Sequence, residues 1–111
     1  MSEPRKDDQQ KLRYDLIPVY PLARLAEVYT IGAAKYGDRN WEGGLKSRRL
    51  IAAMERHLAA LKAGEDVDPD GQRHAASIAW GAFALMHFEG KPELDDRTPD
   101  AAALRLLHGL P

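Results

Sequence analysis

Apolar positions recur at helical spacing in this chain, and no stretch shows the strict alternation that is typical of a strand. Over residues 21–36, apolar side chains such as Leu22 and Leu25 fall on one face at a period of 3.6 residues. Pro21 suits the first turn of a helix, and Gly37 suits its end. The pattern therefore predicts a first helix over this range.

Three more helices are predicted further along the chain. The second covers residues 48–63, with Ser47 as its N-cap, and the third covers residues 72–89. Thr98-Pro99-Asp100 is a strong start signal for a fourth helix over residues 99–108. The expected fold class is all-α, a small four-helix bundle-like domain.

The segment before the first helix has a different character. Residues 1–10 are polar and lack periodicity, so we expect a flexible leader followed by a single helical domain over residues 11–111. Pro18 and Pro21 oppose a regular helix just after the leader. Residues 11–20 are therefore predicted to form an extended, docked segment.

The third predicted helix is apolar on nearly every side. Trp80, Phe83 and Met86 lie away from the side that carries Ile78 and Leu85. A helix that is apolar all round is expected to be buried all round, which a small monomer can hardly provide. We therefore expect a homo-oligomer that forms through helix 72–89.

Composition narrows the class of protein. The 111 residues include 16 basic and 17 acidic side chains and no cysteine, which excludes a wholly basic nucleic-acid coat and any thiolate chemistry. No apolar run is long enough for a membrane span or a signal peptide. We expect a cytoplasmic protein that binds neither membranes nor DNA or RNA.

An acidic turn lies between the second and third predicted helices, where Glu65, Asp66, Asp68 and Asp70 occupy six residues. Hard cations such as Mg²⁺ prefer oxygen ligands, and two of these carboxylates could reach one ion. The alternative is that they solvate the turn, with Asp70 capping the following helix.

Basic and aromatic side chains supply further candidates. On the second helix, Arg49 and Arg56 share a face with small alanines between them, and a guanidinium binds phosphate in a bidentate manner. His57 lies beside that face, so Arg56 and His57 are either phosphate and proton groups or a buried structural pair. His74 opens the third helix and is either a core histidine or a functional one.

The first loop adds an aromatic side chain and an amide. Lys35 and Tyr36 precede this loop, and Asn40 and Trp41 lie within it. Trp41 can stack on a base while Asn40 reads a base edge, or it can instead tie the loop to the core. The sequence contains no glycine-rich phosphate loop and no H-E-x-x-H zinc motif.

Four stretches together resemble one known family: KLRYDLIP, GAAKYGDRNWEGG, SRRLIAAMERHL and GEDVDPDGQRH. They are similar to the N-terminal domain of phage dATP/dGTP diphosphohydrolases, which is related to MazG-like all-α nucleotide pyrophosphohydrolases, and the likeness covers roughly residues 11–89. It implies a helical, commonly oligomeric protein that uses Mg²⁺ or Mn²⁺ and cleaves a purine deoxynucleoside triphosphate to the monophosphate and pyrophosphate.

The resemblance also assigns positions. Its Lys-x-Arg-x-Asp segment falls on Lys11, Arg13 and Asp15, and its later motifs fall on residues already singled out above. Relatives tend to carry His and Asn where this chain has Ser77 and Gly81. The chain also lacks an upstream E-x-x-E, so the acidic signature of MazG-like enzymes is incomplete.

The leading hypothesis is a metal-dependent hydrolase of dATP or dGTP. Its expected catalytic residues are Arg56, His57 and His74, its substrate-binding residues are Lys11, Arg13, Lys35, Tyr36, Asn40, Trp41 and Arg49, and its metal ligands are Glu65, Asp66 and Asp68. The alternative hypothesis is a non-catalytic helical module that binds a nucleotide or a protein partner through the basic face of Arg56 and Lys35.

Overall fold

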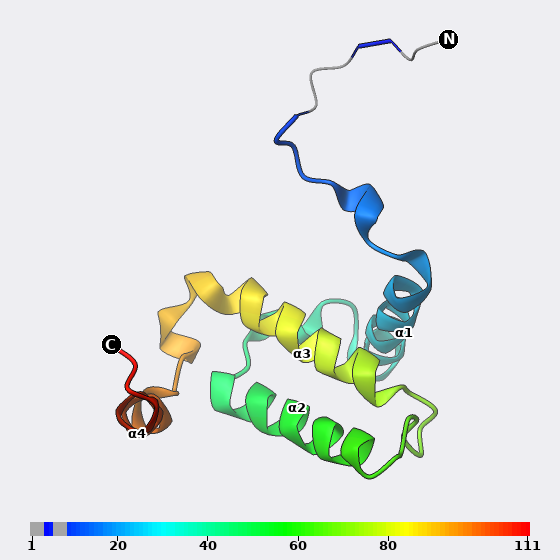
Figure 1. Cartoon of the computed structure of the whole chain (residues 1–111). Coiled ribbons are helices and arrows are strands. Elements are labelled where there is room, and N and C mark those ends of the chain that lie inside the picture. The colour runs from blue at the N-terminus through cyan, green and yellow to red at the C-terminus, as the bar shows by residue number, and fades with distance from the viewer. Residues whose placement is uncertain (1–3, 6–8) are drawn as a thin grey trace.

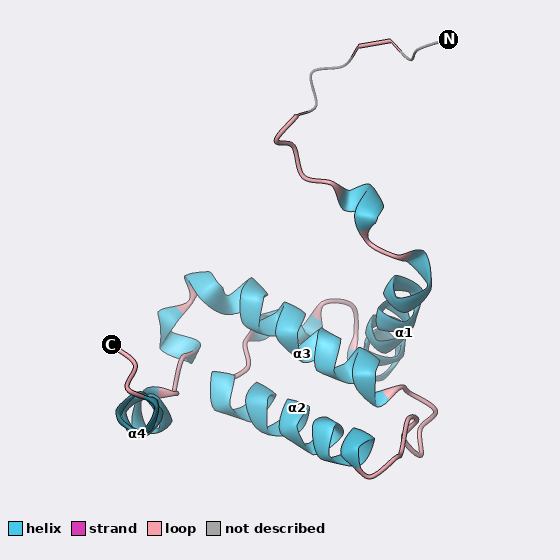
Figure 2. Ribbon diagram, in the orientation of Figure 1, coloured by secondary structure: helices cyan, strands magenta, loops and turns pink. Residues whose placement is uncertain are grey.

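The computed structural model describes residues 4–5 and 9–111, and this part of the chain is helical and contains no strand (Figure 2). The all-α class is confirmed. The predicted leader, residues 1–10, lies mostly outside the described residues. The four α-helices are α1 (Val19–Tyr36), α2 (Ser47–Lys62), α3 (His74–His87) and α4 (Thr98–His108). Short 3₁₀ turns occupy Tyr14–Leu16, Asn40–Gly43, Phe88–Gly90 and Pro92–Leu94.

Helices α2 and α3 lie antiparallel, side by side, and form the best-packed part of the molecule (Figure 1). Their shared core contains Leu50, Ala84 and Phe88, which are 4%, 0% and 6% exposed. Gly81 sits where the two helices meet, since an ideal Cβ there would lie 2.6 Å from Cγ of Met54. The small residues of α3 therefore allow a close approach of α2.

Helix α1 packs across α3 (Figure 1). An aromatic cluster joins the two through the first loop: the Trp41 ring lies 6.0 Å from Tyr29 and 5.8 Å from Trp80, centroid to centroid. Trp80 therefore packs, partly buried, against the core of its own chain, which corrects our expectation that it faces away from that core; its place at an interface between copies stays a prediction. Phe83 and Met86 remain exposed on α3.

The start of the helical body differs from expectation in two details. Helix α1 begins at Val19, so Pro21 lies in its first turn, where an N–H would have no helical partner anyway. Ser47 is the first residue of α2 rather than its N-cap, which is Lys46 without a side-chain cap. Neither change alters the packing.

Residues 11–20 are exposed throughout, which contradicts the prediction of a docked segment. Leu12 and Val19 are 77% and 79% exposed. The hydrogen bonds of Leu16 and Ile17 reach only to Arg13 and Tyr14 and are therefore local. The prolines prevent a longer helix, but the apolar side chains of this segment lack cover from the rest of the described chain.

Helix α4 stands apart from the other three helices (Figure 1). Polar contacts attach the segment around it: Nζ of Lys46 donates to the carbonyl of Glu93 at 2.9 Å, and Nε of Arg48 lies 3.0 Å from Oδ2 of Asp100. Leu106 and Leu107 are 87% and 76% exposed. Among the described residues, no helix has the length and apolar content needed to cross a membrane.

Candidate functional site

The turn between α2 and α3 is closed by the main chain and by one carboxylate. Gly64 has a φ of +88°, and the amides of Gly64 and Glu65 donate to the carbonyls of Leu61 and Ala60, which is a Schellman ending of α2. Oδ1 of Asp68 accepts from the amides of Asp70 and Gln72 at 2.9 and 3.0 Å. This geometry sets Glu65 at one end of the turn and the start of α3 at the other.

Two histidines meet beside this turn. Nδ1 of His57, on α2, lies 2.8 Å from Nδ1 of His74, the first residue of α3. Nε2 of His74 lies 3.0 Å from Oε1 of Glu65, whose side chain is half-exposed. The His74 amide also donates to the carbonyl of Asp66 at 3.1 Å. Helix packing and the turn thus form a hydrogen-bonded chain of Glu65, His74 and His57.

The chain of hydrogen bonds has a direction. A carboxylate only accepts, so Nε2 of His74 carries a proton toward Glu65. When His74 is neutral its Nδ1 is an acceptor, and Nδ1 of His57 donates to it. Nε2 of His57 is then the unprotonated nitrogen of the pair. The arrangement therefore offers one proton acceptor, at His57.

Burial lowers the pKa of the His57 imidazole below its ordinary value, and the charge of neighbouring His74 lowers it further. Asp68 acts in the opposite direction, while Arg56 adds to the lowering. Two adjacent imidazoles disfavour a second positive charge, which explains why His57 favours its neutral form. A neutral imidazole near pH 7 is the form that accepts a proton.

Cationic side chains border the same turn. Nζ of Lys35, at the end of α1, lies 4.0 Å from Oδ2 of Asp70. Arg56 is exposed beside His57 on α2. Both are therefore available to an anion that approaches the turn, because exposed ion pairs of this kind are weak.

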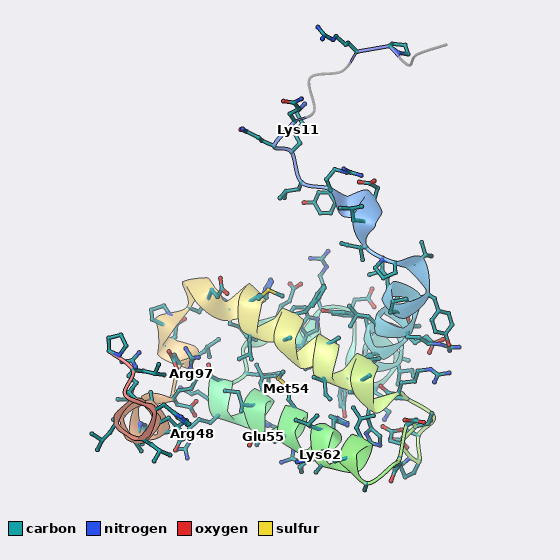
Figure 3. All side chains as sticks on the ribbon, in the orientation of Figure 1. Lys11, Arg48, Met54, Glu55, Lys62 and Arg97 are labelled. Atoms are coloured by element: carbon teal, nitrogen blue, oxygen red, sulfur yellow. The ribbon has the colours of Figure 1, made fainter. Side chains whose placement is uncertain are left out.

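Other predicted site residues lie elsewhere. Lys11 lies on the N-terminal segment, away from the three packed helices (Figure 3), and Arg13 is bonded to Asp15 at 2.8 Å. Arg49 lines a cavity between α2 and α4, about two helical turns from Arg56. Tyr36, the last residue of α1, and Asn40, in the loop that follows, are exposed, and Trp41 belongs to the aromatic cluster described above.

The proposed metal ligands are only partly available. No group of three or more histidines and carboxylates able to hold a metal occurs among the residues the structure describes. Glu65 and Asp68 each use one oxygen in the contacts above, and each keeps a second oxygen without a recorded protein partner. Mg²⁺ is commonly held by one or two carboxylates together with substrate phosphates. The residues therefore fit a cation that arrives bound to a triphosphate, and they do not form a complete protein cage.

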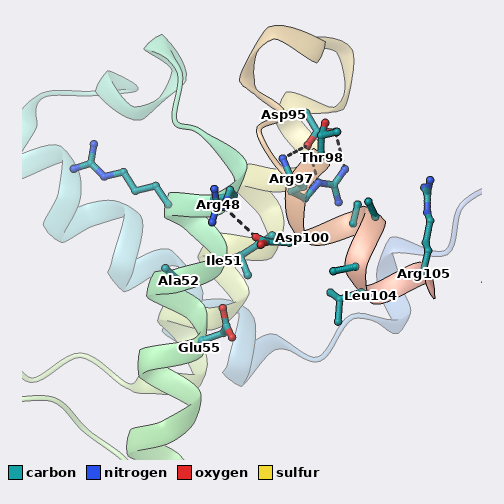
Figure 4. A pocket seen from close by; sticks show the side chains of 14 residues that line it. Arg48, Ile51, Ala52, Glu55, Asp95, Arg97, Thr98, Asp100, Leu104 and Arg105 are labelled. Carbon is teal, nitrogen blue, oxygen red and sulfur yellow. Dashed lines mark hydrogen bonds and ion pairs between the residues drawn. The ribbon is translucent and has the colours of Figure 1, made fainter. Parts of the chain in front are cut away.

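A cavity of about 1200 Å³ lies between α2 and α4 (Figure 4). Arginines border it, but Arg48 pairs with Asp100 and Arg97 pairs with Asp95 at 2.8 Å. Residues of the exposed helix α4 form part of its lining, and polar contacts attach this helix to the other three helices. Neither His57 nor His74 lines this cavity, and the candidate proton, cation and anion groups lie around the acidic turn instead.

Sequence reasoning singled out His57 and His74 separately but did not predict that they touch. Nor did it predict that Glu65 orients His74. A signal was present, since His57 follows Leu50 and Met54 on the inner face of α2. That spacing places His57 on the face of α2 that carries its core residues and so toward the packed side of the hairpin.

Comparison with known proteins gives two matches. A family model described as "dATP/dGTP diphosphohydrolase, N-terminal" matches residues 1–97. A protein of Salmonella phage PMBT28 named "dATP/dGTP diphosphohydrolase" is 39% identical over 99 residues, which are 87% of this chain and 34% of that protein. The chain thus spans about a third of the length of this relative. No solved structure matches the chain.

Proposed function

Because this chain belongs to the dATP/dGTP diphosphohydrolase N-terminal family, we propose that it binds a purine deoxynucleoside triphosphate and hydrolyses it. The products are the nucleoside monophosphate and pyrophosphate. The observation that carries the proposal is the directed chain of Glu65, His74 and His57, beside a turn where cations and carboxylates meet. The name of the phage relative supports the substrate class.

In the proposed reaction a water oxygen bonds to the α-phosphorus, and the bond between this phosphorus and the α,β-bridging oxygen breaks. Nε2 of His57 takes the proton of the attacking water, while His74 and Glu65 hold the imidazole in the required tautomer. Lys35 and Arg56 offset the negative charge of the phosphates. Pyrophosphate leaves with the bridging oxygen.

We include metal dependence in the proposal. Glu65, Asp66 and Asp68 are the carboxylates that would hold Mg²⁺ or Mn²⁺ together with the phosphates of the substrate. When bound, the cation neutralises phosphate charge and polarises the phosphoryl group. Removal of divalent cations by a chelator is expected to abolish turnover, and Glu65→Gln is expected to raise the Mg²⁺ concentration needed for half-maximal rate.

The test is incubation of the protein with each deoxynucleoside triphosphate and Mg²⁺ or Mn²⁺, scoring monophosphate and pyrophosphate. His57→Gln is expected to lower kcat by about 10²–10⁴-fold, the usual contribution of a general base. His108→Gln, on α4, is the matched control and should retain the wild-type rate. Absence of turnover with every nucleotide and both metals would contradict the hydrolase proposal.

A second candidate function is a binding module without turnover. It is favoured by the incomplete acidic signature of the sequence, which lacks an upstream E-x-x-E. Such a module keeps its nucleotide after Glu65→Ala and loses it after Arg56→Ala. A hydrolase instead loses turnover after Glu65→Ala while it stays folded.

We further propose that the chain self-associates through α3, with Phe83 and Met86 at the contact. Phe83 and Met86 are large apolar side chains that are 45% and 55% exposed, and they are three residues apart, so they lie close together on the surface of α3. Light scattering should report a dimer or larger species, and Met86→Glu should shift it toward monomer, whereas Leu106→Glu on α4 should not.

A further inference from the structure

A small cavity of about 160 Å³ lies between the three packed helices, next to the histidine pair. It receives side chains from α1, α2 and α3, and His57 belongs to both the cavity wall and the hydrogen-bonded chain. The wall residues that matter for its chemistry are Val28, Ala53, His57, Ser77, Trp80 and Gly81. None of the functions assigned above uses this cavity.

The cavity exists because the facing positions are small. Ser77 and Gly81 are four residues apart on α3 and so share one face of it. Opposite them on α2, Ala53 contributes only a methyl group. Met54 lies where a Cβ on Gly81 would fall, 2.6 Å from its Cγ, and Ala53, Ser77 and Val28 complete the wall of small and medium-sized side chains.

The residues that line the cavity suit the binding of a small aromatic ring. Most of the lining is apolar, and the side chains in it that carry polar atoms are those of His57, whose Nδ1 is bonded to His74, of Ser77 and of Trp80. Ligand sites typically combine such an apolar wall with a few convergent polar groups. A cavity of roughly 150 Å³ holds one benzene molecule in another protein, so the space here suits a single six-membered ring.

We propose that this cavity is the base subsite of the chain, which takes the six-membered ring of a nucleobase edge-on. The inference rests on the proposed function. With the base beside His57, the phosphates of the nucleotide point toward the acidic turn and Lys35, as the proposed reaction requires. The Ser77 hydroxyl then contacts a polar edge of the ring, and Trp80 borders the ring. Trp41, which does not line the cavity, contacts Trp80 through the aromatic cluster.

The experiment uses nucleosides, which carry the base without phosphates. Deoxyadenosine is added to the wild-type protein, and nuclear Overhauser effects are recorded between the H2 and H8 protons of the base and the methyl groups of the protein. The expected result is a set of effects to the methyls of Ala53 and Val28. Effects confined to methyl groups outside the cavity, or none at saturating nucleoside, would overturn the proposal. The sugar phosphate 2-deoxyribose 5-phosphate should perturb neither methyl.

Substitutions give an independent measure of affinity. Ser77→Leu fills the cavity and should weaken deoxyadenosine binding by about tenfold or more, a change of about 1.4 kcal/mol. Ala75→Leu makes the same kind of change at an exposed position of α3 and should leave affinity within about twofold of wild type. Ser77→Ala keeps the space and should weaken binding by about 2–10-fold, the worth of one neutral hydrogen bond. Equal losses in Ser77→Leu and Ala75→Leu would count against the subsite.

The outcomes separate this proposal from the hydrolase proposal. If the protein hydrolyses triphosphates but the nucleoside shows no contact with Ala53 or Val28, the subsite is wrong and the hydrolase stands. If the nucleoside seats in the cavity but no triphosphate is cleaved, the subsite stands and the hydrolase fails. If Ser77→Leu does not fold, the nuclear Overhauser effects in the wild-type protein still show whether the base lies in the cavity.

Discussion

The α2–α3 hairpin and helix α4 are held in the molecule by different forces. Burial of Leu50, Ala84 and Phe88 holds the hairpin, whereas an exposed ion pair and two hydrogen bonds link the region of α4 to α2. Apolar burial contributes about 1.5–3 kcal/mol for each large side chain, and an exposed ion pair contributes about 0–1 kcal/mol. The hairpin is thus the stable scaffold that carries the histidines, and α4 is a peripheral element.

The largest difference between the hairpin and α4 is expected in the free energy of unfolding when a large apolar side chain of each region is replaced by alanine. Phe88→Ala should lower the free energy of unfolding by about 3–5 kcal/mol, because it removes a buried ring from the shared core. Leu106→Ala, at a position that is 87% exposed on α4, should change it by less than about 0.5 kcal/mol. Urea unfolding followed by circular dichroism measures both. Similar losses in the two variants would mean that α4 is packed in solution.

The turns that precede α3 and α4 are each held by a carboxylate, and loss of that carboxylate is expected to cost a different amount of stability in the two turns. Asp68→Ala removes the acceptor of two amides in a partly buried turn and should cost about 0.5–2 kcal/mol, as loss of a comparable cap does. Asp95 accepts from Arg97 in an exposed turn before α4, and Asp95→Ala should cost less. Asp68→Asn keeps an oxygen acceptor and should recover most of the stability. A larger loss in Asp95→Ala than in Asp68→Ala would reverse the comparison.

The histidine pair makes the hairpin sensitive to acid. The pKa of His57 is lowered in the folded state, so the unfolded chain binds a proton more readily. Its contribution to stability is therefore complete above about pH 6.5, the ordinary histidine pKa, and is lost as pH falls through the lower folded value. An NMR titration of the His57 ring should give a midpoint below 6.5, and His57→Gln should flatten the fall of stability between about pH 7 and pH 5. A midpoint above 6.5 would contradict the direction.

Much of the fold could be predicted from sequence because the signals are local. Helix boundaries depend on nearby residues, so Thr98-Pro99 correctly marked the start of α4 and Gly64 the end of α2. The same signals do not reveal what a helix packs against. They therefore predicted α4 as well as α2, although only α2 has a buried partner surface.

The residues of the site could be predicted from the sequence, but the contacts between these residues could not. The acidic turn and both histidines stand out by residue type, whereas the 2.8 Å contact between His57 and His74 depends on how α2 and α3 pack. That packing in turn depends on Gly81, whose importance appears only when a Cβ is placed against Met54. Trp80 was wrongly predicted to face away from the core for a related reason, since its partner Trp41 is distant in sequence.

The smallest expected effect concerns the ion pair that ties α4 to α2. Nε of Arg48 lies 3.0 Å from Oδ2 of Asp100, with the two side chains 52% and 56% exposed. Asp100→Asn removes the charge but keeps the size, so global stability should change by less than about 1 kcal/mol. Because few other contacts hold α4, its amides over residues 101–108 should nevertheless exchange with solvent faster in this variant, and those of α3 should not. Raising the salt concentration should reproduce the effect in the wild-type protein by screening the pair. Unchanged exchange in both experiments would show that α4 is anchored by something other than this pair.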